Sequence, residues 1–124
     1  MIHLDTHVVV WLYYGRSELI SDKAKKLIEV NDLSISPMVS LELEYLHEAG
    51  KVSVGSKEIL RDLEMRVGLV LASESFELIS EAAIEQSWTR DPFDRLLVAQ
   101  AIIGNARLVT KDRSILRHFG KAMW

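Results

Sequence analysis

The chain is organised around the stretch Arg90-Asp91-Pro92-Phe93-Asp94-Arg95-Leu96-Leu97-Val98-Ala99-Gln100-Ala101. This stretch predicts a helix that begins at Pro92, because Asp91 is a favoured N-cap residue and proline is tolerated in the first turn. The apolar residues that follow predict that the helix is buried. Asp94 falls in the first turn, where exposed backbone N–H groups favour a carboxylate. The two carboxylates are either simple capping groups or part of a metal site.

Length and composition indicate one domain with its own core. The chain has 124 residues, and 48 % of them are hydrophobic. We therefore expect a single domain over residues 1–124. The chain has no cysteine, which excludes disulfides and thiolate metal sites and fits a reducing cytoplasm. No signal peptide is evident, and the apolar residues 8–14 are too few to cross a membrane, so we expect a cytoplasmic protein.

The charge distribution leaves a nucleic-acid partner open. The formal net charge of -3 does not by itself indicate such a partner. Residues 107–124 are nevertheless basic, with Asp112 as their one acid. They form either an ordinary solvated helix surface or an edge that contacts phosphates.

Strand and helix patterns alternate along the chain. Strands are expected at residues 2–4, 33–36, 69–72 and 107–110, with an edge strand at 122–124. Helices are expected at residues 7–14, 23–30, 37–49, 57–67, 77–88, 92–104 and 114–119, although residues 8–10 would suit a strand equally well. Thr6 is expected to cap the first of these helices. This alternation predicts an α/β fold whose parallel sheet is covered by helices on both faces.

Four acidic residues are expected to meet at one edge of this sheet. Asp5 follows the first strand, Asp112 follows the strand at 107–110, and Asp94 starts a buried helix. Glu42 lies in the helix after the second strand. Ligands bind outside the carboxyl ends of the strands of an open parallel sheet, and all four side chains can project there. Taken singly, each acid is better explained as a helix cap or a solvated surface residue than as part of a site, because acids at helix starts are common.

Clustered carboxylates favour a bound cation. Close carboxylates repel one another, which raises their pKa values and costs stability. A cation removes that penalty, and oxygen ligands without histidine or cysteine suit Mg²⁺ or Mn²⁺. Such an ion can support phosphodiester hydrolysis.

Four segments occur in a characteristic order and spacing: Leu4-Asp5-Thr6-His7, Ser36 with Glu42, residues 90–101, and Leu108-Val109-Thr110-Lys111-Asp112. Together they resemble the PIN-domain ribonucleases, in particular the VapC-type toxins of bacterial toxin–antitoxin systems. Residues 90–101 are the most specific of these segments. The resemblance covers essentially the whole chain. It implies a PIN-like α/β/α sandwich with a central parallel sheet and an Mg²⁺- or Mn²⁺-dependent endoribonuclease. It also implies an RNA substrate, a cognate antitoxin and a homodimer.

The family's catalytic and metal-binding residues map onto four positions of this chain by the same resemblance: Asp5, Glu42, Asp94 and Asp112. Thr110 matches a position where the family often has a hydroxyl that orients the site. The chain departs from the family beside Glu42, whose neighbours Leu41 and Leu43 are aliphatic where an aromatic residue is frequent. This departure leaves the chemistry intact but gives no information about the substrate.

Several other side chains have two readings. Asp91 is expected to remain an N-cap, and Arg95 to pair with a carboxylate rather than with phosphate. His3 and His7 flank Asp5, where a general base is conceivable, but a packed or surface histidine is favoured. Lys111 or Arg113 is expected to help hold the RNA backbone.

Aromatic residues carry a similar ambiguity. Their side chains could stack nucleobases, but packing in the core or at a subunit interface is favoured; the residues are Trp11, Tyr13, Tyr14 and Trp88. His47 and His118 belong to no recognisable constellation.

Three other functions compete with the toxin. A phosphoacceptor receiver domain would need a lone aspartate after a central strand, but residues 69–72 are followed by Ser73 and Glu74. A non-catalytic PIN-fold binding module is disfavoured by the complete set of four acids. A PIN-fold nuclease that processes RNA outside a toxin–antitoxin system stays open. For the nuclease, the expected products carry a 5′-phosphate and a 3′-hydroxyl.

Overall fold

A parallel sheet of five strands forms the centre of the molecule. The computed structural model describes the whole chain, residues 1–124. The strands are β1 (Ile2–Leu4), β2 (Leu33–Ile35), β3 (Val70–Leu71), β4 (Arg107–Val109) and β5 (Ala122–Met123). Every neighbouring pair is parallel, in the order β3-β2-β1-β4-β5. The predicted parallel sheet is therefore confirmed.

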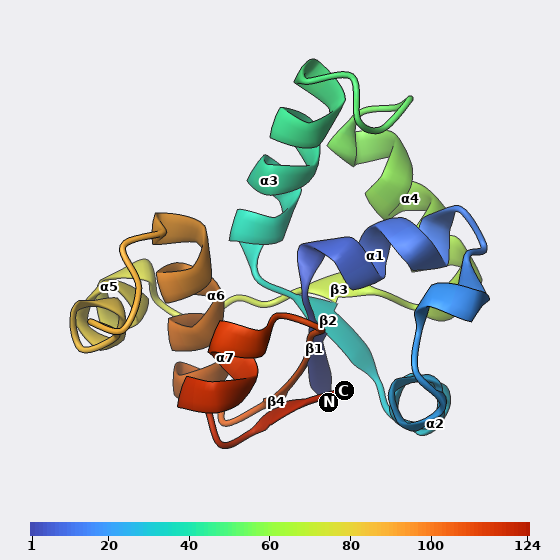
Figure 1. Ribbon diagram of the computed structural model, residues 1–124. Helices are drawn as coiled ribbons and strands as arrows, with labels where there is room; N and C mark the ends of the chain where they lie inside the picture. The colour runs from blue at the N-terminus through green and yellow to red at the C-terminus, as the bar shows by residue number, and fades with distance from the viewer.

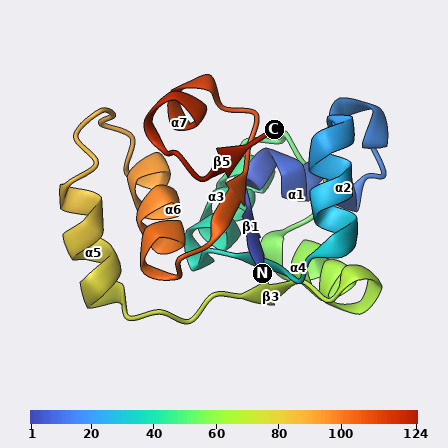
Figure 2. The same cartoon turned by 90° about the horizontal axis from the view of Figure 1, so that it is seen from below.

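Helices cover both faces of this sheet. They are α1 (Thr6–Tyr13), α2 (Asp22–Val30), α3 (Pro37–Glu48), α4 (Ser56–Val67), α5 (Phe76–Ile84), α6 (Pro92–Ile103) and α7 (Arg113–His118), with a short 3₁₀ turn, η1, at Ser17–Leu19. Figure 2 shows α1, α2 and α4 on one side of the sheet and α5, α6 and α7 on the other. Helix α3 contacts α1, α4 and α6 and so joins the two sides. This is the three-layer arrangement expected for a PIN-like fold.

The core forms where the central strands meet α6. Ile2, Leu4 and Leu108 are fully buried in β1 and β4, and Leu97 and Val98 of α6 pack into the same cluster. Five successive residues of α6, from 97 to 101, are buried, as the apolar stretch predicts. Burial of this helix on the sheet fixes the direction of its first turn. No helix has both the length and the apolar character needed to span a membrane.

The start of α6 confirms the predicted cap. Asp91 Oδ1 accepts hydrogen bonds from the backbone N–H groups of Phe93 (2.8 Å) and Asp94 (3.4 Å), and Pro92 occupies the first turn. At α1, however, the N-cap is Asp5 and not Thr6 as expected. A carboxylate in the extended conformation reaches the free N–H groups of the first turn, and Thr6 is already the first helical residue.

Two elements are shorter than predicted. Helix α5 ends at Ile84 rather than at residue 88, because Trp88 turns away and stacks on the His118 ring of α7 with a centroid distance of 4.9 Å. Strand β3 has two residues rather than four, because it is an edge strand that pairs with β2 at two positions.

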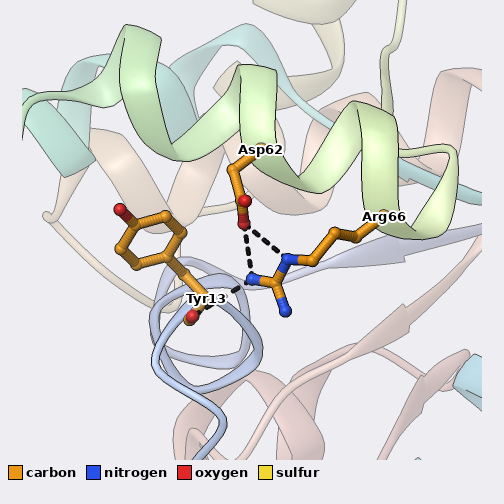
Figure 3. Close-up of polar contacts among 3 residues, drawn as sticks. All are labelled: Tyr13, Asp62 and Arg66. Atoms are coloured by element: carbon orange, nitrogen blue, oxygen red, sulfur yellow. Dashed lines mark hydrogen bonds and ion pairs between the residues drawn. The ribbon is translucent and has the colours of Figure 1, made fainter.

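A bridge on the side of the sheet away from α6 fixes α4 against α1. Arg66 of α4 donates from Nε to Asp62 one turn earlier (2.6 Å) and from Nη2 to the backbone carbonyl of Tyr13 at the end of α1 (3.1 Å), as Figure 3 shows. The carbonyl groups of the last helical turn lack intrahelical partners, so a cationic side chain is favourable there. This contact holds the carboxyl end of α1 against α4.

Candidate active site

A pocket of about 400 Å³ lies where the carboxyl ends of β1 and β4 meet. Its lining includes all four predicted acids, and so the convergence inferred from topology is confirmed. The lining residues are Asp5, His7, Trp11, Glu42, Asp91, Asp94, Lys111 and Asp112. Figure 1 shows the elements that supply them, with α1, α3, α6 and α7 arranged around the ends of the central strands.

The sheet topology explains the location of this pocket. From β1 the chain moves outward to β2 and β3, and it later returns to β4 on the other side of β1 before reaching β5. Connections leave the adjacent strands β1 and β4 in opposite directions, which opens a crevice between their carboxyl ends. Asp5 directly follows β1 and Asp112 lies shortly after β4.

Three helices begin at this pocket. Asp5 is the N-cap of α1, Asp91 of α6 and Asp112 of α7. Asp112 Oδ1 accepts from the backbone N–H of Ile115 at 2.9 Å. These three acids therefore cap helices and line the pocket at the same time. Helix N-termini favour negative charge, which partly offsets the repulsion among the carboxylates.

Hydrogen bonds fix the carboxylate of Asp5. The hydroxyl of Thr110, at the end of β4, donates to Asp5 Oδ2 (2.5 Å), and the backbone N–H of Thr6 donates to Oδ1 (2.7 Å). Burial raises the pKa of Asp5 above its ordinary value, while these two donors oppose the rise. The threonine that the family resemblance pointed to thus contacts the first acid of the site.

Glu42 is tied to the same corner by Thr6. The Thr6 hydroxyl donates to Glu42 Oε1, and so one residue serves Asp5 through its backbone and Glu42 through its side chain. Burial raises the pKa of Glu42, the Thr6 hydroxyl lowers it, and the nearby Asp5 raises it further. This role of Thr6 was not predicted from sequence. The signal that would have helped is a hydroxyl residue directly after the first acid.

Asp94 is the least compensated acid of the pocket. Its carboxylate is half-buried, accepts no hydrogen bond and forms no ion pair. Burial, followed by the charges of Asp91, Asp112, Asp5 and Glu42, raises the pKa of Asp94 to about 7. The local environment therefore disfavours a charged Asp94 unless a cation is present.

The donor set of the pocket suits a hard divalent cation. Oxygen atoms of carboxylates dominate it, and none of these carboxylates is neutralised by a lysine or arginine, since the salt bridges of the chain lie elsewhere. As the side chains stand, no three of them are grouped at the spacing of a metal-ligand set. Hydrogen bonds to protein donors hold Asp5, Glu42 and Asp112 in the arrangement that the structure shows.

Other predicted site residues have different outcomes. The expected carboxylate partner of Arg95 was wrong, because Arg95 donates to the backbone carbonyls of Thr89 (2.7 Å) and Ala83 (3.5 Å). His3 is 2 % exposed, bonds Ser34 Oγ through Nδ1 (2.5 Å) and does not line the pocket. It is the packed histidine that was favoured. Lys111 lines the pocket, whereas Arg113 does not.

The chain is similar in sequence to a known protein family and to a named relative. The profile of the family described as PIN domain matches residues 2–121. The chain is 31 % identical over 118 residues to Ribonuclease VapC22 of Mycobacterium tuberculosis, covering 93 % of this chain and 89 % of that protein.

Solved structures show the same fold. A toxin–antitoxin complex from Klebsiella pneumoniae matches with a TM-score of 0.66 and 15 % identity, over 100 % of this chain and 97 % of that chain. VapBC2 from Rickettsia felis, bound to a DNA fragment from its promoter, matches with a TM-score of 0.67 and 22 % identity, over 99 % and 96 % of the two chains.

Proposed function

The chain belongs to the PIN-domain family, and from this premise we propose that it is an endoribonuclease that acts as the toxin of a toxin–antitoxin pair. The observation that carries the proposal is the pocket in which four carboxylates from separate parts of the chain meet and none of them forms a salt bridge. A relative of similar length that is 31 % identical and named a ribonuclease supports RNA as the substrate. The cytoplasm is where such a protein would meet its RNA.

The proposed cofactor is Mg²⁺ or Mn²⁺. Asp5, Asp94 and Asp112 would hold the ion, and Glu42 would complete its surroundings or orient the attacking water. When bound, a divalent ion neutralises the carboxylates, polarises a phosphoryl oxygen and lowers the pKa of a nearby water. The raised pKa of Asp94 supports this assignment, because a site built for a cation is electrostatically unfavourable without one.

The residues around the acids have positioning roles. Thr110 and Thr6 restrict the orientations of Asp5 and Glu42, which reduces the number of arrangements available to the site before substrate arrives. In the proposed reaction the oxygen of water bonds to phosphorus and the bond from phosphorus to the 3′-oxygen breaks. The 3′-oxygen takes a proton from the water, which leaves a 3′-hydroxyl and a 5′-phosphate.

Two protein partners are included in the proposal. An antitoxin is one, since the structural relatives are toxin–antitoxin complexes. A second copy of the chain is the other. Helices α3, α5 and α6 expose several large apolar side chains, and two of these, Leu41 and Phe76, line a further pocket of about 310 Å³. Such exposure is more typical of an interface than of a monomer surface. These exposed residues are Leu41, Tyr45, Phe76, Leu78, Ile84 and Ile102.

The test is cleavage of RNA by the purified protein. A panel of transfer and ribosomal RNAs is incubated with Mg²⁺ or Mn²⁺, and the ends of the products are sequenced. We expect cleavage that EDTA abolishes. In Asp94→Asn we expect the cleavage rate to fall by at least about 10²-fold. Asp32→Asn is the matched control, because Asp32 is exposed and precedes β2 at the opposite edge of the sheet.

Two results would overturn parts of the proposal. Equal inertness of the wild type and Asp94→Asn over the whole panel would favour a binding module without catalysis. Cleavage without arrest of growth on expression would favour RNA processing outside a toxin–antitoxin system. Growth arrest that Asp5→Asn relieves would support the toxin.

A further inference from the structure

One wall of the acidic pocket carries no carboxylates. It is formed by His7 and Trp11, one turn apart on α1, and by Lys111 after β4. The rings of His7 and Trp11 lie 6.1 Å apart, and Lys111 Nζ lies 5.9 Å from the centroid of the Trp11 ring. We call these three residues the aromatic wall. The proposed metal chemistry assigns no role to His7 or Trp11 in this wall.

Packing holds Trp11 in place. Its ring contacts the ring of Trp124 at 5.9 Å and packs against the hydrophobic core, yet Trp11 stays partly exposed at the pocket. Trp11 therefore packs in the core as expected, but only part of its side chain does so. The part that lines the pocket is a fixed aromatic surface beside the acids.

Lys111 forms no salt bridge. It lines a pocket with five acidic side chains and still forms no salt bridge with any of them. Its ammonium group instead lies over the Trp11 ring, which a cation favours. A charge held in this way, next to a site for a phosphodiester, is available for a phosphate oxygen of the substrate.

We propose that the aromatic wall binds the nucleotide next to the cleaved bond, with its base stacked on Trp11 and its phosphate paired with Lys111. This inference rests on the proposed ribonuclease function and names the form of RNA that the site accepts. Stacking on a protein ring requires an unpaired base, because a paired base is already stacked in its helix. The site therefore takes single-stranded segments of RNA, and stacking makes it tolerant of base identity.

The test separates the base from the backbone. Binding is measured by fluorescence anisotropy with two end-labelled RNA decamers, one of uridines and one with the same sugar–phosphate backbone but no bases. All proteins carry Asp94→Asn so that the probe survives the measurement. We expect the uridine decamer to bind about ten-fold more tightly than the abasic decamer when Trp11 is present.

Matched variants then assign this ratio to Trp11. In Trp11→Leu we expect the ratio of the two affinities to fall to about one, and in Trp11→Phe to lie in between, because the ring is retained. Trp88→Leu is the control, since Trp88 stacks on His118 and does not line the pocket. Equal ratios in Trp11→Leu and Trp88→Leu would overturn the inference. A ratio of one in the protein with all three tryptophans would do so without relying on any tryptophan variant.

The phosphate contact has its own measurement. The logarithm of the affinity for the abasic decamer falls linearly with the logarithm of salt concentration, and its slope reflects the phosphates neutralised. We expect Lys111→Gln to reduce the slope by about 0.7 and Lys57→Gln, on α4 away from the pocket, to leave it unchanged. An unchanged slope in Lys111→Gln would remove Lys111 from the wall.

The outcomes also separate this inference from the proposed function. Metal-dependent cleavage by the wild type, with no dependence of the base-to-abasic ratio on Trp11, leaves the nuclease and rejects the wall. No cleavage under any metal condition, with a ratio that depends on Trp11, rejects the nuclease and retains the wall.

Discussion

The hydroxyl of Thr110 joins the ends of the two central strands by donating a 2.5 Å hydrogen bond to Asp5 Oδ2. Thr110 is fully buried, and its Oγ also accepts from the backbone N–H of Asp112 at 3.0 Å. One hydroxyl thus contacts both acids that follow β1 and β4. Thr110 thereby links the position of β4 to the orientation of the Asp5 carboxylate.

Replacing Thr110 with valine tests this coupling. Valine keeps the volume but leaves Asp5 Oδ2 and the Asp112 N–H without this partner, and we expect the free energy of unfolding to fall by about 1–3 kcal/mol. Loss of the donor also raises the pKa of Asp5, so half-maximal cleavage should move to higher pH. Urea denaturation and a pH–rate profile measure the two effects. Thr110→Ser keeps the hydroxyl and should restore the profile; a Thr110→Val profile equal to that of the wild type would contradict the assignment.

The metal-free protein should lose stability as pH rises. The pKa of Asp94 is raised in the folded state from 3.8 to about 7, so between these values the folded protein binds more protons than the unfolded chain. Stability therefore falls across this window and stays low above pH 7. Asp5 and Glu42, whose pKa values are also raised, act in the same direction. In EDTA we expect a lower Tm at pH 8 than at pH 5, and a smaller decline in Asp94→Asn. A wild-type Tm that rises over this range would show that folding does not raise the pKa values of these acids.

Divalent ions should reverse this loss. At 100 times its Kd, an ion that binds only the folded state adds about 2.7 kcal/mol to the free energy of unfolding. We expect Mn²⁺ to raise the Tm more at pH 8 than at pH 5, because protons compete for the carboxylates. Asp94→Asn should reduce the rise and Asp32→Asn should not. Equal rises in all three proteins would point to a binding site elsewhere.

The elements with strong local signals were predictable from sequence. Asp91 followed by Pro92 fixed the start of α6, since the cap and the first turn use neighbouring residues. The convergence of Asp5 and Asp112 followed from topology, because parallel strands present their carboxyl ends at one edge. Neither inference required a contact between distant side chains.

The features that could not be predicted from sequence depend on contacts between residues far apart in the chain. The hydroxyl of Thr6 reaches Glu42 across 36 positions, and Arg95 binds one carbonyl in α5 and one in the loop before α6. Helix α5 ends early although its residues could continue it, because Trp88 stacks on a ring of α7. Tertiary packing overrides local propensity at each of these places.

A buried hydrogen bond ties the start of α3 to α6. Ser36 Oγ donates to Gln100 Oε1 at 3.0 Å, and Gln100 Nε2 donates to Glu74 at 3.2 Å. Gln100→Leu removes both contacts, and we expect it to lower the free energy of unfolding by about 1–3 kcal/mol. Ser36→Ala is the second single variant of a double-mutant cycle. We expect a coupling energy of about 1 kcal/mol between Ser36 and Gln100. Additive effects in urea denaturation would show that the bond does not link the two helices.

Arg95 should hold the loop that leads into α6. Its Nε donates to the carbonyl of Thr89 at 2.7 Å, within the segment 85–91 that ends at the cap Asp91. Arg95→Met removes this donor but keeps much of the apolar stem, so we expect local opening of the loop with a change of at most about 1.5 kcal/mol in global stability. Hydrogen exchange followed by mass spectrometry should show faster exchange in residues 85–91 and unchanged exchange in β1 and β4. Arg90→Met is the control, because Arg90 is exposed in the same loop. If both variants exchange like the wild type, the loop is held by the Trp88–His118 stack and not by Arg95.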